Sequence, residues 1–90
     1  MNFTEQLIKF RTRLEQRYCA PGAVQVGAGA AYRHYTNGLM WTSVGVYVRR
    51  TMDDGRSRSY SFDTPAPDTA EGWSTLERNA VGFIDYCLGV

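Results

Sequence analysis

Two amphipathic helical patterns lie at the two ends of this 90-residue chain, and three strand-like runs separated by glycine turns lie between them. The first pattern, over about Phe3–Tyr18, repeats apolar residues at steps of three and four, which is typical of one face of an α-helix. The second, over about Thr69–Leu88, does the same. We therefore predict a two-layer α+β fold, in which a three-stranded antiparallel β-meander is flanked by N- and C-terminal helices.

Length and composition bound the kind of protein that this chain forms. Ninety residues suffice for one modest hydrophobic core, so we expect residues 1–90 to form a single domain. A hydrophobic fraction of 43% and a charged fraction of 21% are typical of a folded protein. The formal net charge of +1 does not indicate the strong positive field of a dedicated nucleic-acid binder.

The sequence also gives an expectation for the cellular location. No apolar run approaches the roughly 20 residues that a membrane-spanning helix needs, so we expect no membrane partner. The first residues, Met1–Gln6, lack the basic and apolar segments of a signal peptide. We therefore expect a cytoplasmic protein, in the host cytoplasm if a phage encodes it. There Cys19 and Cys87 would be reduced thiols, and a disulfide or redox pair is the alternative.

The second strand-like run, over about Leu39–Arg50, decides which side chains form the core. Side chains alternate between the two faces of a strand, and β-branched residues dominate one of the two sets. We assign this set to the core, together with the apolar faces of both helices, and call it the valine row: Val44, Val46 and Val48.

The turn before this run is Asn37-Gly38, which predicts a two-residue hairpin turn because both residues tolerate a positive φ. The run that precedes the turn, over about Ala23–Tyr35, contains the small residues Gly27–Ala31. Such a stretch indicates a bulge or a close backbone approach.

The turn after the second run, Asp53-Asp54-Gly55, fixes how the third run pairs. A two-residue turn would place Tyr60 and Phe62 away from the valine row. A three-residue loop with Gly55 in the left-handed conformation places them opposite it. A slip of one residue moves every side chain to the other face, so we predict the three-residue loop.

The sheet face that the helices leave bare is the candidate binding surface. Tryptophan, tyrosine and arginine are enriched in protein-binding hot spots, and aromatic rings also stack single-stranded bases. The residues that we expect on this face are Tyr32, His34, Trp41, Tyr47 and Arg49. The alternative is a second, minor layer in which the first strand or the Pro-rich connector covers Trp41.

The first helix offers another candidate surface, the basic ridge, which consists of Lys9, Arg13 and Arg17 at successive i, i+4 positions. Such a ridge can meet phosphate groups or an acidic protein surface. The alternative is an ordinary solvated helix face, in which Glu5 and Glu15 moderate the charge.

The inventory of reactive residues argues against catalysis. A nucleophilic site needs a base beside the nucleophile and a third group that orients the base. The single histidine, His34, has no convergent carboxylate in the sequence, and Asp53 and Asp54 are ordinary turn residues. Two cysteines and one histidine are too few for a metal site at these spacings. We expect neither an enzyme nor a cofactor.

The order of elements is similar to that of the double-stranded RNA-binding domain over nearly the whole chain. The valine row carries part of the similarity, and the rest comes from the helix residues Leu7, Phe10, Leu14, Ala80 and Leu88. The resemblance implies nucleic-acid binding. That family grips phosphates with lysines that open its second helix, whereas this chain has the acidic stretch Asp68–Gly72 there. Nucleic-acid binding through the basic ridge is therefore our second hypothesis.

The chain also resembles the small single-domain inhibitors that phages and mobile elements carry, of which anti-CRISPR proteins are the best-known class. The resemblance rests on its length, its compact α+β pattern and the lack of a catalytic motif. It implies a stoichiometric inhibitor or adaptor that occludes a surface of a protein or ribonucleoprotein partner. This is our first hypothesis, with the chain acting as a monomer or a homodimer.

Overall fold

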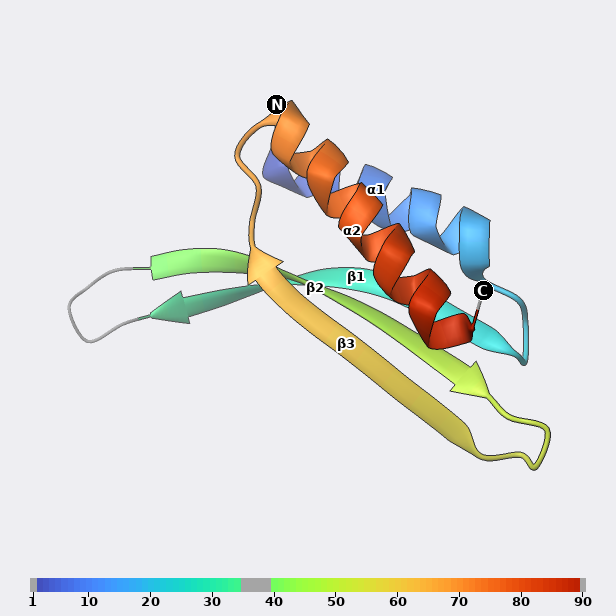
Figure 1. The fold of residues 1–90 in the computed structure, drawn as a ribbon. Coiled ribbons are helices and arrows are strands. Elements are labelled where there is room, and N and C mark those ends of the chain that lie inside the picture. Colours follow the sequence, from blue (N-terminus) through green and yellow to red (C-terminus); the bar gives the residue numbers. More distant parts are fainter. Residues whose placement is uncertain (1, 35–39, 90) are drawn as a thin grey trace.

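The computed structural model describes residues 2–34 and 40–89, with the backbone alone at residues 32–34 and 40–42. Its elements, in chain order, are α1 (Phe3–Tyr18), β1 (Val24–His34), β2 (Met40–Thr51), β3 (Ser57–Pro65) and α2 (Ala70–Leu88). The strands form one antiparallel sheet in the order β1-β2-β3. Both helices lie on the same side of this sheet (Figure 1). The predicted α+β fold, a β-meander between two helices, is confirmed.

The first helix has the bounds that its sequence predicts, Phe3–Tyr18. The side-chain oxygen of Asn2 accepts a hydrogen bond from the amide of Thr4 at 2.7 Å, which satisfies one of the free N–H groups of the first turn. The helix stops at Cys19, and Gly22 turns the chain back with a φ of 79°. This turn brings β1 beneath α1.

The second helix is capped by Thr69 and not by the preceding Asp68, because the hydroxyl of Thr69 accepts a hydrogen bond from the amide of Gly72 at 2.9 Å. Threonine and aspartate both cap well, so the choice is set by where the connector from β3 delivers the chain. The helix ends at Gly89, whose φ of 74° is the left-handed conformation that glycine favours there.

The core lies between the helices and the side of the sheet that carries the valine row. All three valines of the row are fully buried, as predicted. They meet apolar side chains of both helices and of β1, and these are Phe10, Leu14, Trp73, Leu76, Ala80, Ile84, Val26 and Ala28. Trp73 fills the space between the helices, because its ring lies beside those of Phe3 and Phe10.

The predicted three-residue loop between β2 and β3 is present. The amide of Met52 donates to the carbonyl of Arg56 at 2.7 Å, and Gly55 has a φ of 84°. The pairing that follows places Phe62 opposite Val46 and Tyr60 opposite Val48. Phe62 packs edge-on against Phe83 of α2, with ring centroids 4.9 Å apart. The helices do not reach as far as Tyr60, which is 37% exposed.

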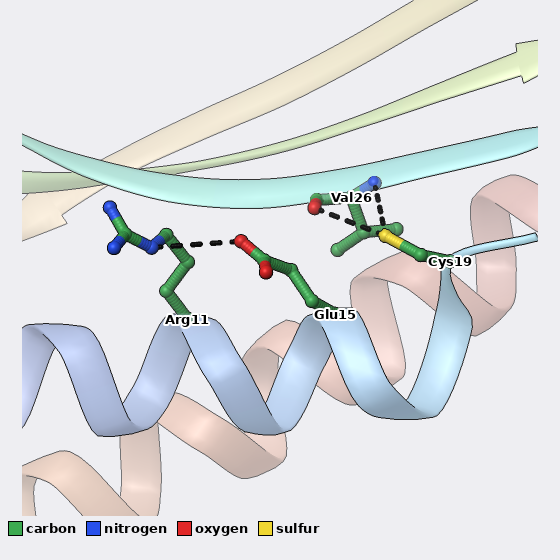
Figure 2. Close-up of polar contacts among 4 residues, drawn as sticks. All are labelled: Arg11, Glu15, Cys19 and Val26. Carbon is green, nitrogen blue, oxygen red and sulfur yellow. Dashed lines mark hydrogen bonds and ion pairs between the residues drawn. The ribbon is translucent and has the colours of Figure 1, made fainter. Parts of the chain in front are cut away.

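The free edge of β1 is closed where the chain enters the strand. Ala20 and Val24 exchange two backbone hydrogen bonds of 3.0 Å. The thiol of Cys19 then takes the place of a neighbouring strand, because the amide of Val26 donates to its sulfur at 3.4 Å and the sulfur approaches the carbonyl of Val26 at 3.5 Å. Figure 2 shows this contact beside the Arg11–Glu15 ion pair, on the side of α1 that faces β1.

The predicted core is testable with two substitutions on α1. Leu14→Ala should lower the free energy of unfolding by about 2–5 kcal/mol, because the fully buried side chain leaves a cavity between α1 and the sheet. Ile8→Ala on the same helix is the control, since Ile8 is 45% exposed, and it should cost less than about 1 kcal/mol. Urea denaturation measures both. Equal losses would contradict the assignment of the core face.

Candidate functional site

No described element covers the side of the sheet opposite the helices (Figure 1). The central strand β2 presents Tyr47 and Arg49 on this bare face, because they alternate with the buried valine row. The backbone at Trp41 belongs to the same alternating set of β2 positions. These three residues of the predicted site therefore share one face by register.

Tyr32 and His34 do not share that face, which corrects our prediction. The register pairs Tyr32 with Thr42 and His34 with Met40, so both hold positions in the set that contains the valine row. Residue Arg33, not His34, pairs with Trp41. The observed pairing differs by one residue from the one that a two-residue Asn37-Gly38 turn would give, and a shift of one residue exchanges the faces. That turn itself lies outside the described residues.

The ring of Tyr47 lies flat against the sheet because the residue opposite it is a glycine. Tyr47 pairs directly with Gly27 of β1, and a Cβ atom at Gly27 would collide with the Tyr47 ring and hydroxyl. This is the close approach that the small residues of the first strand predict, and the register shows no bulge along β1. One side of the ring covers the buried backbone of Gly27, while 43% of the residue remains exposed. The ring is thereby ordered before any partner arrives.

A hollow of about 320 Å³ lies beside Tyr47 on the bare face. Gly29 and Gly45 pair across its floor, where Gly29 has no neighbouring side chain within 4 Å of a Cβ position. Asp63 of β3 leans over Gly45, so that its carboxylate oxygen lies 2.7 Å from the place of a Cβ atom there. The hollow is therefore bounded by an aromatic ring on one side and a carboxylate on the other. It can receive a small or hydrogen-bonding group of a partner.

Arg49 extends the surface toward the other end of the bare face. Its guanidinium donates to the hydroxyl of Ser57 at 3.2 Å, which fixes the side chain across β2 and β3. A second hollow of about 480 Å³ adjoins Arg49 and is lined by Gln25, Thr51 and the turn that joins α1 to β1. Tyr47 and Arg49 thus stand between two hollows.

The β2–β3 hairpin end carries a cluster of charge that our prediction did not single out. We call it the arginine end, and it consists of Arg49, Arg50, Arg56 and Arg58. Arg50 and Arg58 pair directly across the two strands, an arrangement of like charges that destabilises a sheet. Only Asp53 and Asp54 oppose this charge locally, and Asp54 pairs with Arg56 at 3.7 Å. Four arginines within ten residues are the signal that would have revealed it.

The basic ridge of α1 is partly engaged by the protein itself. The guanidinium of Arg13 forms an ion pair and hydrogen bond with the carboxylate of Glu77 on α2. Arg17 lies over the ring of Tyr18, with 5.5 Å from its guanidinium carbon to the ring centroid. Lys9 is exposed. Two of the three cations therefore serve contacts within the fold.

Tyr18 adds a second polar contact between the two helices, which we call the Tyr18 joint. Its hydroxyl donates to the carboxylate of Asp85 at 2.7 Å and also approaches the carbonyl of Val81 at 3.3 Å. Burial raises the pKa of the Tyr18 phenol, and the hydrogen bond to Asp85 raises it further, while Arg17 opposes both effects. The neutral phenol is therefore the form that the fold stabilises.

The remaining reactive groups form no further site among the described residues. No set of three or more His, Cys, Asp or Glu side chains within residues 2–34 and 40–89 lies close enough to hold a metal ion. Cys19 and Cys87 are both free thiols, and burial raises the pKa of Cys87, which lowers its fraction of reactive thiolate. Neither of the two described helices is long and apolar enough to cross a bilayer.

Comparisons of this chain with protein-family models, with curated proteins and with solved structures found no match. The two resemblances that the sequence suggests therefore stay predictions.

The Tyr18 joint makes a prediction about alkaline pH. Because the folded-state pKa is raised, the unfolded chain ionises first, so stability should fall as the pH rises above about 10 and through the folded-state value. Tyr18→Phe removes this contribution, and its stability should fall less steeply there than that of the wild type. Thermal unfolding at several pH values measures the difference. Identical slopes would contradict a protonated, hydrogen-bonded Tyr18.

Proposed function

We propose that this chain is a non-catalytic binding protein whose bare sheet face docks on a protein or ribonucleoprotein partner. In this role it acts as a small inhibitor or adaptor of the anti-CRISPR type, occluding the surface that it covers. The single observation that carries the proposal is Tyr47, which lies exposed at the centre of the bare face and is ordered against Gly27.

The physical case for Tyr47 as an anchor rests on what binding costs. A flexible side chain loses rotamer freedom on binding, whereas a ring already packed on backbone has lost most of it. Tyrosine also combines a large apolar surface with a hydroxyl, which explains its enrichment in hot spots. The adjacent hollow, between Tyr47 and Asp63, offers a complementary recess for a partner side chain.

The arginine end suggests the charge of the partner. Arg49 lies on the bare face beside Tyr47, whereas Arg50 and Arg58 pair with each other on the other face, at the hairpin end of the sheet. The charge of this end therefore attracts an acidic partner through its long-range field and not through direct contact. Charged groups at the edge of a contact mainly accelerate encounter and select the orientation of the partner. An acidic protein surface or the phosphate groups of a ribonucleoprotein both satisfy this requirement.

Nucleic-acid binding through the basic ridge has weaker support. Arg13 and Arg17 are engaged in contacts with Glu77 and Tyr18, so their charge is partly compensated within the fold. The helices lie on one side of the sheet (Figure 1), and Tyr47, which alternates with the buried valine row, is on the other. The basic ridge and the bare face therefore cannot meet one flat partner together. We therefore place the partner on the bare face.

Tyr47→Ala tests the anchor. With a partner captured from host lysate and then purified, the substitution should weaken binding by about 2 kcal/mol or more, which is roughly 30-fold in Kd. Ile8→Ala is the control, because Ile8 is similarly exposed but lies on α1, and its affinity should equal that of the wild type. Trp41→Ala, at a register position on the bare face, should also weaken binding. Wild-type affinity in both Tyr47→Ala and Trp41→Ala, with unchanged circular dichroism, would refute the proposed surface.

The arginine end predicts a salt-dependent association rate. The double substitution Arg50→Gln, Arg58→Gln should slow association with an acidic partner several-fold at low salt and flatten its dependence on ionic strength, with little change in dissociation. Arg11→Gln combined with Arg78→Gln is the matched control, since it removes the same charge from exposed arginines on α1 and α2. Surface plasmon resonance at two salt concentrations separates the two rates. If the control slows association as much as the double variant does, the arginine end has no special role.

A further inference from the structure

The free edge of β3 is an unpaired hydrogen-bonding surface of the described sheet. The strand has nine residues, and its register with β2 runs without a bulge to Pro65 at its end. Natural edge strands are usually short, kinked, covered or protected by lysine. On the other side of the sheet, Ala20 and Cys19 close the start of the β1 edge, and no described residue does the same for β3.

The hydrogen-bond pattern shows which backbone groups of β3 point outward. Thr51 of β2 donates to Ala23 on the β1 side, and the next residue, Met52, donates to Arg56 on the β3 side. Because an antiparallel ladder alternates, the β3 residues paired with Val46 and Val48 bond inward. The amide and carbonyl groups of the residues between them point away from the sheet, and these residues are Ser59, Ser61 and Asp63.

The side chains beside this edge are apolar on the helix side. Tyr60 remains 37% exposed although it shares the face of the valine row, and Phe62 is only half-buried against Phe83. The edge therefore combines unpaired backbone groups with two aromatic rings that the helices cover incompletely.

We propose that a second copy of this chain pairs with this edge, β3 against β3, about a two-fold axis at Ser61. The outward groups of the two Ser61 residues then bond to each other, and Ser59 of each copy bonds to Asp63 of the other. The result is one six-stranded sheet, made from two sheets of three strands, with all four helices on one side.

A second copy of this chain is the expected partner, because β3 is complementary to β3 of another copy in this register. Tyr60 of each copy comes to lie directly beside Phe62 of the other, a cross-strand aromatic pair that forms twice and covers the ring that the helices leave exposed. Like charges stay apart, because Arg58 faces Thr64 and Asp63 faces Ser59. A two-fold contact of this kind is isologous and therefore closed at two chains.

The pairing also enlarges the bare face. A two-fold axis perpendicular to the sheet keeps both bare faces on the same side, so two Tyr47 residues and two hollows form one continuous surface. The pairing does not depend on the proposed docking function, because it concerns the purified chain alone.

Sedimentation equilibrium of the purified chain tests the pairing. The apparent mass of the wild type should rise from the 10.2 kDa of one chain toward twice that value as its concentration is raised to about 1 mM, the range in which a weak contact forms. Ser61→Pro removes an amide that does not bond to β2, so it should give a folded monomer. Ser61→Ala is the matched control, since it keeps the amide, and it should remain dimeric. A monomeric wild type, or a dimeric Ser61→Pro variant, would overturn the proposal.

A pair of cysteine variants reads the register and does not need the proline variant to fold. In the proposed register the two Ser61 Cα atoms lie about 5.5 Å apart, within the range that a disulfide spans. Ser61→Cys should therefore form a disulfide between the introduced thiols on mild oxidation. Ser59→Cys should not, because Ser59 lies four residues from its counterpart, roughly 13 Å away. Cross-linking of both variants, or of neither, overturns the register.

These results are independent of the test of Tyr47. If the purified chain is monomeric but binds its partner through Tyr47, the β3 pairing is wrong and the proposed function stands. If the chain dimerises but captures no partner, the β3 pairing stands and the proposed function is wrong. If β3 amides become protected from hydrogen exchange only when a foreign protein is added, the edge takes a strand from that protein and the self-pairing is wrong.

Discussion

Packing of the valine row against two helices is the constraint on which the rest of this structure depends. Val44, Val46 and Val48 are fully buried, and they bring Phe10 and Leu14 of α1 together with Leu76, Ala80 and Ile84 of α2 on one side of the sheet. Because side chains alternate along β2, burying this row turns Tyr47 and Arg49 outward. The bare face is therefore a direct consequence of how the core is built.

The glycines of the sheet determine what the bare face becomes. Gly27 lets the ring of Tyr47 lie on the backbone, and Gly45 lets Asp63 lean inward, while Gly29 stays open between them. Side chains at these three positions would fill the hollow and lift the ring. A single uncovered face thus acquires an ordered aromatic residue, a recess and a carboxylate without any covering layer.

Much of this architecture could be predicted from the sequence, because large apolar side chains carry the signal. The helix periodicity gave the bounds of α1, and the need to place Phe62 beside Val46 fixed the loop at Gly55. The predicted face of Tyr32 and His34 was wrong. Residues Gly27–Ala31 have too little side-chain volume to indicate which of them point inward. In the sequence, only the Asn37-Gly38 turn signal indicates which face each residue of β1 occupies, and the observed register differs from that signal by one residue. The role of Arg13 at Glu77 was also beyond the sequence, since it depends on how two distant helices meet.

Chemical labelling of exposed tyrosines, in the free chain and in the complex, tests the central claim most directly. Tyr47 lies on the bare face, and Tyr86, which is 85% exposed on α2, serves as an internal reference. If the bare face is the docking surface, the partner should strongly reduce labelling of Tyr47 and leave that of Tyr86 unchanged. Equal labelling of Tyr47 in the free and bound chain would show that the partner binds elsewhere, and the account would be wrong.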